Sequence, residues 1–159
     1  MSLTIKLVRI DDRLIHGQVA TVWAKQTGVN RIFVVNDEVA KDDFRKKLLK
    51  QATPPGVKAN IITVQKMIDV YPDSKYDSLN VMLLFTNPAD IQRVVEGGVP
   101  IQSVNVGGMA FSEGKRKLTA AVSVTDEDIE AFTYLNSKGV ELEIRQVIKD
   151  KPTDLASLI

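Results

Sequence analysis

The chain has 159 residues, of which 44% are hydrophobic and 26% charged, with 21 Lys and Arg against 20 Asp and Glu. This length and composition predict a single globular domain over residues 1–159, and the balanced charge gives no basis for attraction to nucleic acid or to a membrane surface. No apolar run reaches the roughly 18 residues of a membrane helix. Because there is no cysteine, disulfides and thiolate catalysis are excluded. The N-terminus lacks the layout of a signal peptide, so we expect a cytoplasmic protein.

Strand-like and helix-like segments alternate along the chain. Short runs rich in β-branched residues predict strands at 5–10, 31–35, 59–63, 78–85, 101–106, 118–124 and 140–147. Helical spacing and capping signals predict helices at 17–26, 39–51, 64–71, 88–96 and 125–139. Among these signals are Asp37 as an N-cap, Pro88 in a first helical turn, and a capping box formed by Thr125 and Asp128.

This order predicts an α/β fold: a doubly wound, mostly parallel central sheet with helices on both faces. The run 78–85 is the most apolar, as expected for a strand buried on both faces. Residues 140–147 alternate in polarity and predict an exposed edge near the C-terminus, where edge strands can be antiparallel. Trp23, Phe33, Phe85 and Phe132 are expected in the core.

His16, the only histidine, lies in the loop 11–16 between the first strand and the first helix. Ligands of such sheets bind beyond the carboxyl ends of the strands, and a helix N-terminus stabilises a phosphoryl group. Arg13 could bind phosphoryl oxygens, and Gly17 allows close backbone approach. Asp11 or Asp12 could orient the imidazole or hold Arg13, and the sequence does not choose between them.

Two further loops end at the same predicted edge. Thr86 lies in the turn 85–88, and Gly107 and Gly108 lie in the turn 105–110, where hydroxyl and backbone N–H groups suit a phosphate. Each of these turns is also common in proteins without a bound phosphate. His16 could equally be a helix cap with no role in chemistry. The basic run 115–117 fits either a surface that binds an acidic partner or a solvated face. A single histidine excludes a multi-histidine zinc site, and nucleotide-binding glycine motifs are missing, so we expect no cofactor.

The stretch 8–19, VRIDDRLIHGQV, resembles the active-site signature of the mannose/fructose/sorbose-class IIB components of the bacterial sugar phosphotransferase system (PTS). The resemblance extends to residues 34–37, 85–88 and 105–109. It implies that His16 takes a phosphoryl group at Nδ1 from a phosphorylated IIA protein and passes it to a sugar that enters through membrane IIC and IID components. It also implies that Arg13 neutralises the phosphoryl charge, that Asp11 orders the loop, and that Thr86, Gly107 and Gly108 line the pocket without a metal.

The resemblance leaves several properties open. Mannose, fructose, sorbose and N-acetylhexosamines all remain as sugars, and two copies could pair as a homodimer. One competing hypothesis is a regulatory or adaptor domain in which phosphorylation of His16 acts as a switch. Another is a structural domain that binds a free anion at the start of the helix.

Overall fold

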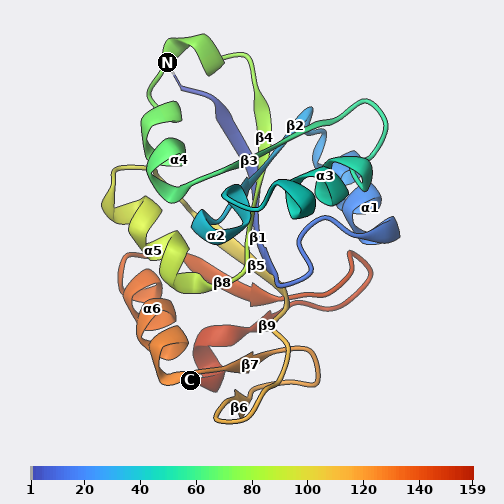
Figure 1. Cartoon of the computed structure of the whole chain (residues 1–159). Helices are drawn as coiled ribbons and strands as arrows, with labels where there is room; N and C mark the ends of the chain where they lie inside the picture. The colour runs from blue at the N-terminus through green and yellow to red at the C-terminus, as the bar shows by residue number, and fades with distance from the viewer. Residues whose placement is uncertain (1) are drawn as a thin grey trace.

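A computed structural model describes residues 2–159, except for the side chains of Gln18 and Val19. Seven strands form the main sheet, in the order β3-β2-β4-β1-β5-β8-β9, and two more form a separate hairpin (Figure 1). The strands are β1 (Thr4–Asp11), β2 (Arg31–Val35), β3 (Lys58–Ile62), β4 (Asn80–Phe85), β5 (Ser103–Gly108), β6 (Arg116–Lys117), β7 (Ser123–Val124), β8 (Glu141–Ile144) and β9 (Thr153–Asp154).

Helices follow most of the strands. They are α1 (Gly17–Thr27), α2 (Asp37–Ala40), α3 (Asp43–Gln51), α4 (Val64–Val70), α5 (Pro88–Glu96) and α6 (Asp126–Ser137), with 3₁₀ turns η1 (Ser74–Tyr76) and η2 (Leu155–Leu158). All pairs in the main sheet are parallel except β8 with β9. The predicted doubly wound α/β fold, with an antiparallel strand at its C-terminal edge, is confirmed. Within residues 2–159, no helix is long and apolar enough to cross a membrane.

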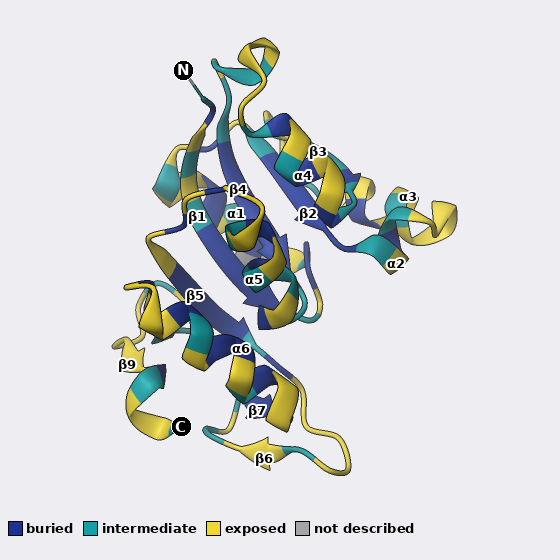
Figure 2. Ribbon diagram, turned by 90° about the vertical axis from the view of Figure 1, so that its left-hand side faces the viewer, coloured by how far each residue is buried: buried dark blue, intermediate teal, exposed yellow. Residues whose placement is uncertain are grey.

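The sheet divides the core into two layers because successive side chains of a strand point to opposite faces. On β4, Leu83 and Phe85 pack against α4, α5 and α6, whereas Met82 and Leu84 pack against α1, α2 and α3. Figure 2 shows the buried strands between these helices. The prediction that this strand is buried on both faces is confirmed, as is the placement of the four large aromatic residues in the core.

The predicted helix over 39–51 is wrong, because the chain forms two helices there. Asn36, not Asp37, caps α2 by accepting a hydrogen bond from the Val39 N–H, and Asp42 starts α3 by accepting from Arg45. The Asp37 carboxylate instead accepts from the Val64 N–H at 2.9 Å, at the start of α4. Pro88 at the start of α5 is confirmed, and so is the capping box before α6.

Three strand predictions need correction. Residues 118–124 do not form a single strand: Thr119 Oγ1 accepts from the N–H groups of Ala121 and Val122, so the chain turns there and β7 pairs with β6. The strand predicted over 140–147 ends at Ile144, and β9 forms the sheet edge in its place. The strand predicted over 101–106 runs from Ser103 to Gly108, which places both glycines inside β5.

Candidate functional site

The loop after β1 lies at the carboxyl edge of the sheet, as predicted. β1 pairs with β4 on one side and with β5 on the other. The chain then enters α1 on one face, whereas α5 and α6 pack on the opposite face. In open α/β sheets, a crevice forms beyond the strand ends where neighbouring connections run to opposite faces of the sheet, and ligands bind in this crevice.

A tight turn carries the chain from β1 to α1. Asp11 is the last residue of β1, its backbone carbonyl accepts from the Leu14 N–H at 2.8 Å, and its carboxylate accepts from the Arg13 N–H at 3.1 Å. Leu14 adopts a left-handed φ of 59°, a conformation that costs a leucine about 1 kcal/mol or more. Leu14 and Ile15 are buried beneath α1, and this burial holds the turn in place.

His16 lies directly before α1, with both ring nitrogens facing protein groups. Nδ1 lies 3.1 Å from the Leu14 carbonyl oxygen, and Nε2 lies 3.9 Å from Asp11 Oδ2. Because a carbonyl only accepts, Nδ1 carries the proton in this arrangement. Nε2 is buried and lies beyond hydrogen-bond distance of every described group. The side chain is 22% exposed, which leaves the ring accessible from one side.

The structure distinguishes the two aspartates that the sequence left equivalent. Asp11 is fully buried, and its carboxylate faces Arg9, Arg13 and His16 at 3.3, 3.7 and 3.9 Å. The carboxylate of Asp12 instead accepts a hydrogen bond from the Ala110 N–H at 2.5 Å. Asp11 is therefore the residue placed to orient the histidine loop, and Asp12 connects that loop to the chain after β5.

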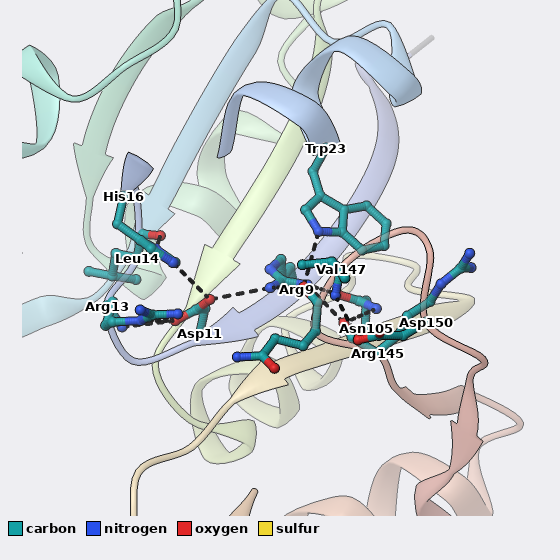
Figure 3. A network of polar contacts seen from close by, with 11 residues as sticks. Arg9, Asp11, Arg13, Leu14, His16, Trp23, Asn105, Arg145, Val147 and Asp150 are labelled. Atoms are coloured by element: carbon teal, nitrogen blue, oxygen red, sulfur yellow. Dashed lines mark hydrogen bonds and ion pairs between the residues drawn. The ribbon is translucent and has the colours of Figure 1, made fainter. Parts of the chain in front are cut away.

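Arg13 extends from the turn toward solvent. Its side chain is 58% exposed, and only its Nε approaches Asp11 Oδ1, at 3.7 Å. Because the arginine of this pair is largely exposed and the two groups are 3.7 Å apart, the pair contributes little to stability. Arg13 and His16 thus lie next to the same Asp11 carboxylate (Figure 3).

The N-terminus of α1 has no side-chain cap. His16 occupies the N-cap position but its side chain makes no capping hydrogen bond, and the first turn holds no acidic residue. The backbone N–H groups there carry the partial positive charge of the helix. Gly17 has a φ of 47°, and a Cβ built on it meets nothing within 4 Å. Glycine is therefore favoured here by backbone conformation, not by crowding.

The three remaining predicted residues, Thr86, Gly107 and Gly108, lie near the histidine loop but differ in what they contact. Thr86 Oγ1 accepts hydrogen bonds from the side-chain amides of Asn36 and Asn87, and lines a hollow of about 390 Å³ with Asp12 and Lys115. His16 does not line that hollow. A Cβ on Gly107 would overlap the guanidinium of Arg9, and one on Gly108 would lie 3.6 Å from Asp11 Oδ1. The space beside Gly107 is therefore occupied by Arg9.

Sequence reasoning missed the buried support of this site. Arg9 is 2% exposed, lies within β1 and contacts Asp11, while its guanidinium also bonds to Asn105 in β5. Burial lowers the pKa of Arg9, and the Asp11 carboxylate offsets part of this change. An arginine between the apolar residues Val8 and Ile10 of a central strand was the available signal, since a buried arginine requires partners. Within residues 2–159, no three His, Asp or Glu side chains are grouped to hold a metal ion.

Comparisons with known proteins agree on one family. The family model described as "PTS system sorbose subfamily IIB component" matches residues 5–159. The "PTS system mannose-specific EIIAB component" of Escherichia coli (strain K12) is 59% identical over 99% of this chain, but the match covers 49% of that protein. The chain thus spans about half the length of this and the equivalent mannose-specific relatives.

Other relatives match along nearly their whole length. The "PTS system sorbose-specific EIIB component" of Lacticaseibacillus casei is 48% identical over 99% of this chain and 96% of that protein. Among solved structures, the IIBSor domain of the sorbose permease from Klebsiella pneumoniae superposes with a TM-score of 0.95 at 46% identity. The alignment covers 98% of this chain and 95% of that one. The resemblance seen in the sequence is therefore confirmed.

Proposed function

The chain belongs to the sorbose-subfamily IIB family of the PTS, and we propose that it is a phosphocarrier in sugar uptake. In this proposal residues 1–159 act as one domain, His16 accepts a phosphoryl group, and the same group then passes to a sugar. The observation that carries the proposal is the convergence of His16 and Arg13 on the buried Asp11 carboxylate, at the uncapped start of α1.

Each residue has a defined part in the proposed transfer. A ring nitrogen of His16 forms a bond to phosphorus while the bond from phosphorus to the donor's histidine nitrogen breaks, and that electron pair stays on the donor nitrogen. Arg13 and the N–H groups of α1 stabilise the charge on the phosphoryl oxygens. Before transfer the His16 proton has to move from Nδ1 to Nε2; the transfer step itself then moves no proton and needs no separate acid or base. We infer no cofactor.

The acceptor nitrogen follows from the family resemblance, which points to Nδ1. Because Nδ1 lies 3.1 Å from the Leu14 carbonyl, the ring has to turn away from that oxygen and present a lone pair. The proton then resides on Nε2, which donates toward Asp11, the nearest carboxylate at 3.9 Å. Asp11 thereby selects the tautomer in which Nδ1 is the nucleophile.

The partners are proposed from the relatives. The mannose-specific relative is named an EIIAB component, which supports a IIA protein or domain as the donor. We propose membrane IIC and IID components as the route to the sugar, so that the chain works in the cytoplasm at the membrane surface. We propose a sugar of the mannose, fructose, sorbose or N-acetylhexosamine class, which relatives named for mannose, sorbose, fructose and N-acetylgalactosamine support. We further propose pairing of two copies, which sedimentation measures directly.

The decisive experiment is phosphorylation by a mannose-class IIA protein that already carries phosphate on its histidine. We expect one alkali-stable, acid-labile phosphate per chain, mapped to His16 by mass spectrometry, and none in His16→Ala. The second step adds membranes containing IIC, IID and radiolabelled mannose, fructose or sorbose. Sugar phosphate formed at the expense of phosphohistidine supports the carrier.

The two competing hypotheses give different results in the same experiment. Phosphate that forms on His16 but does not leave when acceptor membranes and sugar are added supports a regulatory switch. A wild-type chain that takes no phosphate from a competent donor refutes the carrier and leaves only anion binding. His16→Ala must keep the wild-type unfolding midpoint for its loss of phosphate to count.

A further inference from the structure

Arg9 is a buried cation next to the site, and its guanidinium has four hydrogen-bond acceptors. Its guanidinium donates to Asp11 Oδ2 at 3.3 Å, to Asn105 Oδ1, and to the backbone carbonyls of Arg145 at 3.1 Å and Gln146 at 2.9 Å. The ring of Trp23, from α1, covers it with a centroid 5.1 Å from Cζ. Figure 3 shows these groups joined in one network that ends at His16.

The Asp11 carboxylate contacts different residues on its buried side and on its outer side. On its buried side the carboxylate pairs with Arg9, whose side chain is 3% exposed. On its outer side it faces the two residues proposed to handle the phosphoryl group, Arg13 and His16. An arginine anchored by three other acceptors cannot follow its partner, so it determines where the Asp11 oxygens lie.

We propose that Arg9 is a positioning residue for phosphoryl transfer, acting on His16 only through Asp11; this rests on the proposed function. Arg9 holds Oδ2 on the side of the imidazole and neutralises the carboxylate from behind. Without it, the buried carboxylate has only the exposed Arg13 left as a permanent cation, and it turns toward that residue. His16 then loses the fixed acceptor that selects its tautomer.

The anchoring carbonyls extend the proposal to the segment after β8. Arg145 and Gln146 lie between β8 and β9 and offer Arg9 two backbone oxygens. The Trp23 indole N–H also approaches the Gln146 carbonyl, at 3.4 Å. The C-terminal segment therefore supports the histidine loop although it contributes no residue to the reacting atoms.

The alternative is that Arg9 merely fastens the C-terminal segment to the core. That role predicts a loss of stability and a rate loss independent of Asp11. Positioning predicts instead that the effects of Arg9 and Asp11 on the transfer rate are coupled, because one acts through the other. A double-mutant cycle on the rate separates these two roles.

The test measures single-turnover transfer from phosphorylated IIA to the full chain in Arg9→Met, Asp11→Asn and the double variant. We expect Arg9→Met to slow transfer at saturating donor by about tenfold or more, with the half-saturating donor concentration within about twofold of wild type. We expect the double variant to match Asp11→Asn within about twofold. Arg31→Met is the matched control: Arg31 is a partly buried arginine that bonds Asn60 Oδ1 at 2.7 Å at the start of β2, at the opposite end of the sheet from the histidine loop, and this variant should keep the wild-type rate.

Several results would overturn the proposal. If the rate losses of the two single variants multiply in the double variant, Arg9 acts independently of Asp11. A wild-type transfer rate in Arg9→Met shows that Arg9 has no role in transfer. If Arg9→Met loses the near-UV signal of Trp23, Arg9→Lys replaces it; one ammonium cannot serve all four acceptors, so transfer should fall by about threefold or more. A wild-type rate in Arg9→Lys is then the contradicting outcome. Failure of the unmodified chain to accept phosphate refutes the proposed function itself and is recognised before any variant is compared.

Discussion

A single methyl group added at Gly107 should dislodge Arg9. A Cβ at this position in β5 would overlap Nη2 and Cζ of the Arg9 guanidinium, which is pinned between Asp11, Asn105 and two backbone carbonyls. The guanidinium cannot move without breaking a buried charge pair, which costs about 3–5 kcal/mol. Alanine regains about 0.5 kcal/mol through its lower backbone entropy. We therefore expect Gly107→Ala to lower the free energy of unfolding by about 3 kcal/mol.

Urea denaturation followed by Trp23 fluorescence measures this loss, since Trp23 is the only tryptophan and its ring lies over Arg9. Gly108→Ala is the matched control, because a Cβ there lies 3.6 Å from Asp11 Oδ1, an ordinary contact. We expect that variant to change the free energy by less than about 1 kcal/mol. Equal losses in the two variants, or a loss below about 1 kcal/mol in Gly107→Ala, would refute the assignment of Gly107 as the space that admits Arg9.

Three further predictions concern the turn and a helix cap. Arg13→Ala should slow phosphoryl transfer by about 10²-fold or more while the unfolding free energy changes by less than about 0.5 kcal/mol, because the side chain is largely exposed; a wild-type rate contradicts its role. Gly17→Ala should lower the free energy of unfolding, measured by urea denaturation, by about 1 kcal/mol, because alanine is strained at a φ of 47°. An unchanged free energy would show that the turn adopts another conformation without cost. Asp37→Asn should weaken the start of α4 near neutral pH, because the Val64 N–H, and then Arg93, lower the pKa of Asp37. The stabilisation by Asp37 is present above its ordinary pKa of 3.8 and disappears as the pH falls through the lowered pKa of the folded state. The unfolding free energies of wild type and variant should therefore converge in acid, and a constant difference from pH 7 to pH 2 contradicts this.

The regular part of the fold was predictable because burial on two faces leaves continuous apolar runs in β2 and β4. The errors occur where a local hydrogen bond outweighs such a pattern. Asp42 accepts from the Arg45 N–H and starts a new helix inside a segment of uniform helical character. Thr119 folds the backbone of 119–122 into a turn although the flanking residues favour a strand. Neither choice is visible in polarity or spacing.

The candidate site was predictable only on its outer side. His16 and Arg13 stand out because they are polar residues in a loop that opens a helix. Arg9 was missed because the sequence placed the end of β1 one residue early, so that Asp11 was assigned to the loop. Extending the strand to Asp11 puts Arg9 and Asp11 two residues apart on the same face, and side chains at that spacing are neighbours.

This alternation along β1 also places the core residues and the residues that support the site on opposite faces of the sheet. Val8 and Ile10 point into the layer formed with α4, α5 and α6, while Arg9 and Asp11 point to the face that Trp23 covers. A carboxylate buried on that face cannot adapt to an approaching phosphoryl group; it keeps one orientation before the donor arrives. Preorganised charge of this kind lowers the barrier without reorganisation during the reaction. Substitutions beneath Asp11 should therefore affect both folding and transfer, whereas substitutions at the exposed Arg13 should affect transfer alone.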